Sequence, residues 1–188
     1  MKVRETPLPG VLMVEPEVFG DGRGLFFETY RAQRYAEAGI PASFVQDNVS
    51  LSERGVLRGL HLQNPNPQGK LIYVLEGEVF DVAVDVRVGS PTFARWTGTV
   101  LSGENKLQLY IPEGFAHGYC VLSETALFAY KCTDVYTAAS ELSIIWNDPA
   151  IGIEWPVDGP LLSPRDAAAP RLGDIDPGGL PRYAGSGG

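Results

Sequence analysis

No apolar run in the sequence approaches the roughly 20 residues that a membrane-spanning helix needs. Near the beginning, the only apolar stretch covers residues 11–14, which is too short for the core of a secretion signal. We therefore expect neither export nor membrane insertion, and we expect a cytoplasmic protein.

Cysteine and positive charge are both scarce. The two cysteines, Cys120 and Cys132, are too few for a disulfide framework or for a zinc site built from several thiolates. Both lie in apolar segments, which predicts buried free thiols in a reducing compartment. With 15 Lys and Arg against 23 Asp and Glu, the formal net charge is −8, which disfavours nonspecific nucleic-acid binding. A few converging arginines can still bind a small anionic ligand inside an acidic protein.

Helical patterning is scarce as well. The only helix we predict covers about residues 31–38 and ends at Gly39, with Pro41 beyond it. Glycine and proline are abundant, with 22 and 15 residues, and they favour many turns and short strands. The length predicts one domain with a full core over residues 1–175, and a flexible Gly/Pro-rich tail over residues 176–188.

Alternation of apolar and polar residues is the dominant pattern. In residues 78–87, Phe80, Val82 and Val84 fall on one face of a predicted half-buried strand, and Asp81 and Asp85 fall on the other. Residues 106–111 repeat this pattern, and further strands are predicted over residues 11–19, 24–30, 44–50, 56–63, 70–75, 94–101, 117–122, 126–133 and 142–146. About ten short strands with one small helix predict an all-β antiparallel sandwich or jelly-roll barrel. Such barrels hold ligands in the mouth or between the sheets.

The first of only two histidines, His61, lies in an unusual strand. By strict alternation, Leu57, Gly59 and His61 share one face and Arg58 lies on the other, although a bulge at Gly59 would change that register. A hydrogen-bonded core histidine is the simplest interpretation. However, basic groups that include Lys70, together with a histidine and glycines, converge on one hairpin. This convergence favours a functional site.

The second histidine, His117, follows Pro112 and Gly114 in a P-x-G-x-x-H spacing that resembles the second motif of the cupin superfamily, where this histidine usually binds a metal. The first cupin motif needs H-x-H, but this chain has His61-Leu62-Gln63 there and no third histidine. A catalytic zinc or iron requires at least three protein ligands. Two imidazoles with a carboxylate remain an alternative, but we expect a cupin barrel, a double-stranded β-helix, without metal.

Tyrosines and carboxylates have plain structural interpretations when each is taken alone. Tyr130 packs in a strand and Tyr136 in a turn, while Asp166, Glu28 and Glu141 are surface charges. A buried phenol near a basic group is also a competent proton donor, which keeps Tyr130 as a candidate acid.

Several segments together resemble the dTDP-4-dehydrorhamnose 3,5-epimerase family, from about residue 7 to residue 171. In chain order they are F-x-D-x-R-G-x-F-x-E (residues 19–28), Q-D-N-x-S (46–50), G-V-L-R-G-L-H (55–61), Q-G-K (68–70), D-V-R-x-G-S-P-T-F (85–93), G-F-A-H-G (114–118), Y-K-C (130–132), W-N-D-P (146–149) and R-D (165–166). Each motif alone is weak, but this order is highly specific.

The resemblance implies catalytic roles for four residues. His61 is the general base that removes protons from the carbons next to the C4 ketone of the sugar, and Asp166 hydrogen-bonds it. Tyr130 protonates the enolate from the opposite face, and Lys70 stabilises the developing oxyanion. No metal and no redox cofactor is implied, because the ketone already acidifies the C–H bonds.

The resemblance also implies a site for a dTDP-4-keto-6-deoxyhexose, with an aromatic residue, Tyr136, stacked on the thymine. The implied substrate-binding residues are Arg23, Glu28, Gln46, Asp47, Asn48, Arg58, Lys70, His117, Tyr136, Glu141 and Arg165. It further implies a homodimer in which the N-terminal strands contribute to the neighbour's sheet.

Three positions depart from the family pattern. Leu62 stands where an aromatic commonly follows the base, which predicts a different pocket floor. Arg165 replaces the more frequent lysine, and Val49 takes a usually more polar or thiol-bearing place. We predict a 3,5-epimerase of dTDP-L-rhamnose biosynthesis. The alternatives are a mono-epimerase acting at C3 or C5 in secondary metabolism, a metal cupin oxygenase and a non-catalytic sugar-binding jelly roll.

Overall fold

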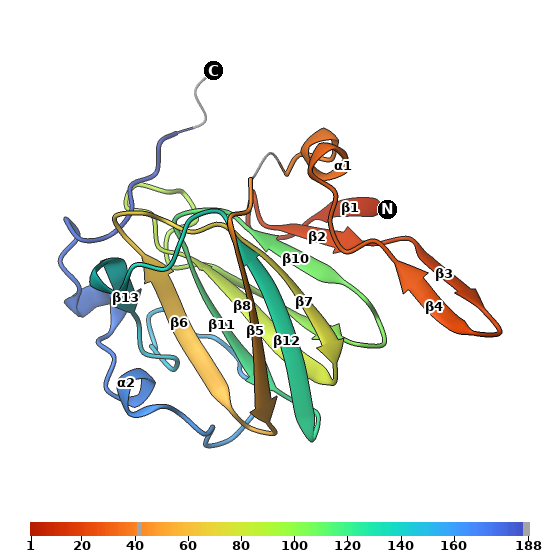
Figure 1. Ribbon diagram of the computed structural model, residues 1–188. Coiled ribbons are helices and arrows are strands. Elements are labelled where there is room, and N and C mark those ends of the chain that lie inside the picture. Colours follow the sequence, from red (N-terminus) through yellow and green to blue (C-terminus); the bar gives the residue numbers. More distant parts are fainter. Residues whose placement is uncertain (41–42, 186–188) are drawn as a thin grey trace.

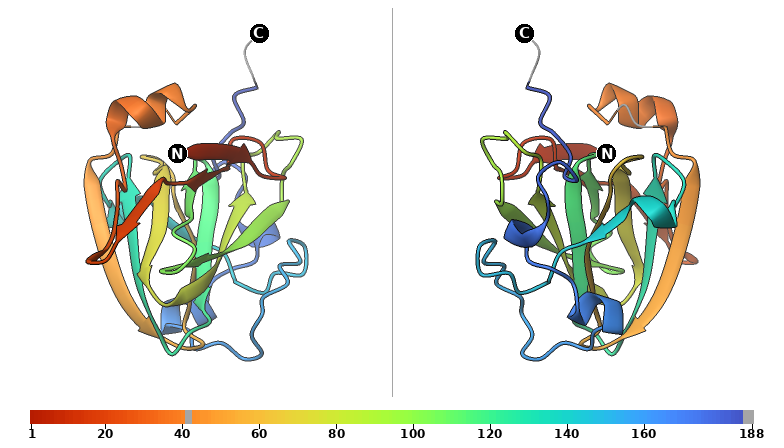
Figure 2. Two further views of the ribbon diagram at one scale, coloured as in Figure 1. Left: turned by 90° about the vertical axis from the view of Figure 1, so that its right-hand side faces the viewer. Right: turned by 90° about the vertical axis from the view of Figure 1, so that its left-hand side faces the viewer.

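The computed structural model describes residues 1–40 and 43–185. Two antiparallel sheets pack face to face, and a hairpin of β3 (Val18–Asp21) and β4 (Gly24–Phe27) projects from them (Figures 1 and 2). The six-stranded sheet has the order β1 (Lys2–Glu5), β2 (Leu12–Glu15), β10 (Gln108–Ile111), β7 (Lys70–Glu76), β12 (Thr125–Cys132) and β5 (Gln46–Glu53). The five-stranded sheet has the order β13 (Glu141–Ser143), β6 (Leu57–Gln63), β11 (Phe115–Val121), β8 (Glu78–Asp85) and β9 (Trp96–Ser102).

The predicted all-β jelly-roll architecture is confirmed, with local differences. The strand expected over residues 11–19 is two strands, because Pro16 lies between β2 and β3 and offers no N–H to a ladder. Strand β1 was not predicted, since its four mostly exposed residues carry no alternation. Two short helical turns, η1 (Ala138–Ser140) and η2 (Leu172–Asp174), and helix α2 (Pro164–Ala167) were also not predicted. None of the helices in the described residues is long and apolar enough to cross a membrane.

The predicted helix is α1 (Ala32–Glu37), and Gly39 ends it as expected. Gly39 has φ +88° and donates its N–H to the carbonyl of Ala36, while the N–H of Ile40 donates to the carbonyl of Tyr35. This pair of bonds is the Schellman motif, in which a left-handed residue, most readily glycine, satisfies the last carbonyls of a helix. Pro41 lies outside the described residues.

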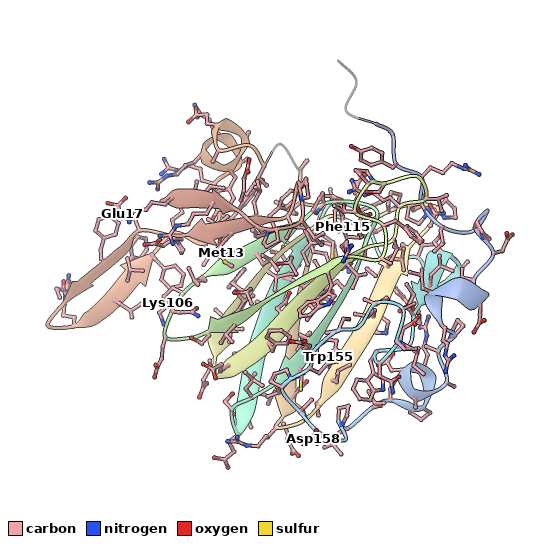
Figure 3. All side chains as sticks on the ribbon, turned by 180° about the vertical axis from the view of Figure 1, so that it is seen from behind. Met13, Glu17, Lys106, Phe115, Trp155 and Asp158 are labelled. Carbon is pink, nitrogen blue, oxygen red and sulfur yellow. The ribbon has the colours of Figure 1, made fainter. Side chains whose placement is uncertain are left out.

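The apolar core has one cluster between the sheets, a second on the outer face of the five-stranded sheet, and a third in which Tyr35 of α1 packs with Leu71 and Tyr110 of the six-stranded sheet. That outer face is covered by the chain after β13, through Ile144, Ile151, Leu172 and Leu180. Figure 3 shows Trp155 in this covering segment, where its ring packs edge-on to that of Phe80. Both faces of the five-stranded sheet are therefore buried.

The chain beyond residue 175 packs against the barrel as far as the structure describes it. Leu180 is buried, the N–H of Val88 donates to the carbonyl of Pro181, and the N–H of Tyr183 donates to the carbonyl of Val88. The expected flexible tail therefore includes a segment that pairs with the barrel. Residues 186–188 of that tail lie outside the described residues.

Strand β8 differs from the prediction of a half-buried strand. Its apolar face packs into the outer cluster through Val82 and Val84. Its other face, which carries Asp81 and Asp85, is also completely buried, inside the barrel. The alternation was read correctly, but the face taken as solvent-exposed lies in the interior, because the chain after β13 covers the opposite face.

Strand β6 carries a bulge at Gly59. His61 pairs with His117 and Arg58 pairs with Tyr119, so β6 has one more residue than β11 between the two pairs. Gly59 has φ +121°, and a Cβ at this position would lie 2.6 Å from the Cα of Gly118, which requires glycine. The expectation from strict alternation is wrong. The bulge that was left open is present, and it turns Arg58 and His61 to the same side.

Candidate active site

A cavity of about 650 Å³ opens between the two sheets. Strands β5, β6, β7, β11 and β12 line it, together with Glu141 of β13, residues 161–163, and Arg165 and Asp166 of α2. Its volume is in the range of pockets that enclose small ligands. Most of the expected site residues meet here: His61, Lys70, Tyr130, Asp166, Gln46, Asn48, Arg58, His117, Tyr136, Glu141 and Arg165.

The His61 side chain forms a pair with Asp166. Its Nε2 lies 2.6 Å from Asp166 Oδ1, and the carboxylate is almost completely buried while the imidazole is about one-third exposed. Asp166 is placed by α2, which starts at the N-cap Ser163 and has Pro164 in its first turn. With Nε2 engaged, Nδ1 is the ring nitrogen left to accept a proton, and the carboxylate stabilises the resulting imidazolium.

Tyr130 lies on the opposite wall of the cavity from His61. Tyr130 belongs to β12 of the six-stranded sheet, whereas His61 belongs to β6 of the five-stranded sheet, and both line the cavity. Burial raises the pKa of Tyr130 to about 12, so its phenol keeps its proton at neutral pH. The cavity thus has an imidazole that can accept a proton on one wall and a phenol that can donate one on the other.

Lys70 supplies a buried cation to the same cavity. Only 8% of the residue is exposed, and no hydrogen bond or ion pair of its ammonium group occurs within the described residues. Burial lowers the pKa of Lys70, although the charges of Asp81 and Glu141 oppose this effect. An ammonium group without a fixed partner is suited to stabilising negative charge that develops on a ligand.

Sequence reasoning missed Asp81, which holds the second histidine. His117 Nε2 lies 2.9 Å from Asp81 Oδ2, and the ring of His117 stacks on that of Phe128. The second oxygen, Asp81 Oδ1, is buried without a hydrogen-bond partner among the described residues. The signal that could have identified Asp81 is an aspartate with apolar residues on both sides in a strand, four positions before Asp85 on the same face.

Sequence reasoning assigned no individual role to three further wall residues, Ser50, Tyr119 and Cys132, although Ser50 and Cys132 lie in two of the motifs quoted above. Ser50 Oγ and the hydroxyl of Tyr119 lie 2.8 Å apart, and Asn48 Nδ2 donates to Cys132 Sγ. Cys120 and Cys132 are buried free thiols, as expected. These polar side chains give the inner face of β5 a row of hydrogen-bonding groups along the cavity.

The mouth of the cavity contains a ring of three side chains. The hydroxyl of Tyr136 donates to Glu141 Oε2 at 2.6 Å, and Arg165 Nη1 donates to the same oxygen. Burial favours the neutral form of Glu141, but these two donors outweigh it and lower the pKa of the carboxyl. Tyr136 is half-exposed, so its ring is accessible to a planar ligand group.

Three expected ligand residues lie away from the cavity of this chain. Arg23 is at the tip of the β3–β4 hairpin, paired with Asp21, and Glu28 at its base pairs with Arg31. Asp47 faces outward from β5 and accepts two hydrogen bonds from Lys131 Nζ.

Two of the departures from the family pattern lie in different places. Leu62 packs into the outer cluster with Ile144 and is also among the residues that line the cavity, whereas Val49 is exposed on the outer face of β5. In the described part of the chain, no three His, Cys, Asp or Glu side chains are grouped as metal ligands would be.

The profile of the family described as dTDP-4-dehydrorhamnose 3,5-epimerase matches residues 5–174. A protein of that name from Salmonella typhimurium is 59% identical over 92% of this chain and 96% of the relative. The Neisseria gonorrhoeae protein of that name is 57% identical over 89% of this chain, which spans 52% of that relative. A dTDP-4-dehydrorhamnose 3-epimerase from Streptomyces niveus is 42% identical over 98% of this chain and 90% of the relative.

Among solved structures, an epimerase from Legionella pneumophila superposes with a TM-score of 0.94 at 55% identity. The match covers 97% of this chain and 98% of that one, and the Legionella protein is described in complex with dTDP-4-keto-L-rhamnose.

Proposed function

The chain belongs to the dTDP-4-dehydrorhamnose 3,5-epimerase family, and we propose that it converts dTDP-4-dehydro-6-deoxy-D-glucose to dTDP-4-dehydro-L-rhamnose by inverting C3 and C5. This reaction belongs to dTDP-L-rhamnose biosynthesis. The single observation that supports it best is the pair of opposed walls, with the His61–Asp166 pair on one sheet and the protonated Tyr130 on the other.

Inversion follows from that opposition. His61 takes the proton from a carbon next to the C4 carbonyl, and the electron pair of the C–H bond moves onto the carbonyl oxygen as an enolate. Lys70 stabilises this oxyanion, and Asp166 stabilises the imidazolium. Tyr130 then delivers a proton to the other face of the same carbon. Because C3 and C5 both adjoin C4, the same chemistry serves each centre.

The remaining wall residues bind the nucleotide. Arg58, held by two hydrogen bonds to Ser52 Oγ, and Arg165 supply positive charge for the diphosphate, and Tyr136 stacks on the thymine. His117, Gln46 and Asn48 offer hydrogen-bonding groups from the cavity wall. These assignments follow the family's motifs position by position, and the meeting of these residues at one cavity supports them.

We propose that the chain forms a homodimer, in which the partner supplies the expected ligand residues that lie away from the cavity of this chain. Strand β5 is an open edge of the six-stranded sheet and exposes Val49 and Leu51, and the projecting hairpin exposes Phe19 and Phe26. Covering these apolar side chains with a second copy is favourable. In this arrangement the partner's hairpin brings its Arg23 and Glu28 to the cavity mouth. Sedimentation of Phe26→Asp against the unsubstituted protein tests it, and a dimer of unchanged strength in the variant contradicts it.

We also propose a cytoplasmic location, which the two buried free thiols support.

The test of the reaction is deuterium incorporation from heavy water into dTDP-4-keto-6-deoxyglucose, followed by NMR. Label at both C3 and C5, with the L-lyxo product trapped by a downstream reductase, is the expected result. Label at one carbon identifies a mono-epimerase, the activity that the Streptomyces niveus relative is named for. Tight binding without label identifies a sugar-binding protein or another keto-sugar substrate. Turnover that depends on bound iron or zinc identifies a metal cupin enzyme.

A further inference from the structure

Helix α2 carries two neighbouring side chains that point to different partners. Asp166 reaches His61 in the cavity, and Arg165 reaches Glu141 at its mouth. The helix has only four residues, Pro164–Ala167, which is too short to be stable without outside contacts. Contacts with the rest of the barrel must therefore set its position.

The backbone around α2 is fixed only at its two ends. Before the helix, the carbonyl of Leu161 accepts from the N–H of Leu57, and after it the carbonyl of Pro170 accepts from the N–H of Ile145. Between these two points, the backbone hydrogen bonds of the described residues join residues 163–169 only to one another, and none reaches the barrel. Asp166 is the only buried residue in this stretch. Side chains must therefore hold the helix against the barrel.

Glu141 is well placed to do this, because it lies on a strand next to the one that carries the base. In the β13–β6 pair, Glu141 is opposite Gln63 and Ser143 is opposite His61. The Glu141 side chain is only 11% exposed, and one oxygen accepts from both Arg165 and Tyr136. That oxygen is thus occupied by protein donors before any substrate arrives.

We propose that Glu141 is a positioning residue for the base: through Arg165 it fixes α2 to β13, and α2 in turn holds the Asp166 carboxylate on His61 Nε2. This inference rests on the proposed function and gives Glu141 a role other than direct contact with substrate. Two side-chain contacts, Asp166 with His61 and Arg165 with Glu141, hold one short helix. If the Arg165–Glu141 contact is lost, only the Asp166–His61 contact still holds the helix in position. A displacement of about 1 Å in such a catalytic partner can cost about 100-fold in rate.

The two roles predict different kinetics. A residue that binds substrate directly changes the KM and the affinity for dTDP when it is replaced. A residue that positions His61 lowers kcat, and it leaves dTDP binding unchanged or tighter, because Arg165 is released to meet the diphosphate.

The test compares Glu141→Gln with Glu15→Gln, a matched control. Glu15 is likewise bonded to an arginine, Arg4, at the same 2.5 Å distance as the Glu141–Arg165 contact, but on the exposed face of β1 and β2. Three quantities are measured on each full-length protein: amide hydrogen exchange at residues 166–168 without ligand, kcat and KM for deuterium incorporation, and the Kd of dTDP by calorimetry.

For Glu141→Gln we expect about tenfold faster exchange at residues 166–168 and a kcat lower by about 10- to 100-fold, up to the cost of a displacement of about 1 Å. The dTDP Kd should not weaken by more than about threefold. Arg165→Lys, which keeps the charge and one donor, should give a kcat between those of the unsubstituted protein and Glu141→Gln. Glu15→Gln should match the unsubstituted protein in all three quantities.

Unchanged amide exchange at residues 166–168 in Glu141→Gln overturns the proposal, as does a raised KM with an unchanged kcat. If Glu141→Gln does not fold, Glu141→Asp replaces it, because its shorter side chain keeps the charge but cannot reach both donors. The exchange measurement needs no substrate. It therefore tests the positioning role of Glu141 independently of the proposed reaction. The proposed reaction is contradicted instead if the unsubstituted protein incorporates no deuterium.

Discussion

The barrel contains two histidine–aspartate pairs of similar length and different construction. His117 and Asp81 lie on neighbouring strands, β11 and β8, with their nitrogen and oxygen 2.9 Å apart. His61 and Asp166 lie 2.6 Å apart, but one is on a strand and the other on a four-residue helix 105 positions later. The His61 side chain is 34% exposed and that of His117 is 9% exposed.

The difference shows that the surroundings, and not the pair itself, decide what an imidazole–carboxylate contact does. The sheet register fixes the His117–Asp81 pair and limits its contact with solvent, which suits a wall. The His61–Asp166 pair joins strand β6 to helix α2, and its imidazole is open to the cavity. This exposure suits a group that must gain and lose protons. Asp81 Oδ1, buried without a partner in the described residues, strengthens this contrast.

The largest effect is expected from His61→Ala. Removal of the base should lower deuterium incorporation at C3 and C5 by at least about 1,000-fold, within the range for loss of a general base. The Kd of dTDP should stay within about threefold, because the nucleotide contacts lie elsewhere on the wall. NMR of the exchange and calorimetry check both parts. Retained turnover in this variant would show that His61 is not the base. The His61–Asp166 pair would then have no function that distinguishes it from the His117–Asp81 pair.

Asp166→Asn should lower kcat by about 100-fold, since the amide cannot stabilise the imidazolium as a carboxylate does. Its effect on stability should be small, below about 1 kcal/mol, because the imidazole of His61 is 34% exposed and stays solvated from the cavity when the charge of Asp166 is removed. Steady-state kinetics and urea unfolding measure the two quantities. A kcat within threefold of the unsubstituted protein would contradict the assigned role.

Asp81→Asn should show the opposite profile. It should cost about 1–3 kcal/mol in the free energy of unfolding, because the amide places an unpaired donor in a fully buried position. Its kcat should fall by less than about tenfold. The same two assays apply. If Asp81→Asn proves as damaging to kcat as Asp166→Asn, the two pairs share one function and the comparison fails.

The smallest effect concerns Lys70, whose charge lies near Asp81. Burial lowers its folded-state pKa below the ordinary value of 10.5, so the unfolded chain binds more protons between those two values. In that alkaline window, stability should therefore rise with pH. Lys70→Met should remove this rise and stabilise the fold by about 1 kcal/mol near neutral pH. Thermal unfolding at several pH values measures it, and a destabilised Lys70→Met would show that the ammonium is better satisfied than its surroundings suggest.

Much of the fold could be predicted from local pattern. The alternation in β8 and β10, and the glycine stop after α1, each depend on residues close together in the chain. The bulge in β6 could be offered only as an alternative, because it depends on Gly118 of another strand approaching Gly59. The burial of Asp81 could not be predicted from the local sequence for a similar reason. It depends on the chain after β13 covering the opposite face of the sheet.

The site was predictable mainly through family resemblance. From the residues alone, Asp166 was a surface charge, and a four-residue helix leaves no periodic signal in the sequence. The resemblance paired it with His61, and the described geometry has them in contact. What neither could supply is the arrangement at the mouth, where Arg165 and Tyr136 share one oxygen of Glu141.

The late position of α2 has a consequence for synthesis and turnover of the protein in the cell. Every strand of both sheets leaves the ribosome before Asp166 does. A nascent chain, or one cut by a protease just before α2, contains His61, Lys70 and Tyr130 but no carboxylate to hold His61. Under the proposed mechanism, catalytic competence is acquired last, and the exchange activity of a preparation reports the fraction of molecules whose C-terminal segment is intact.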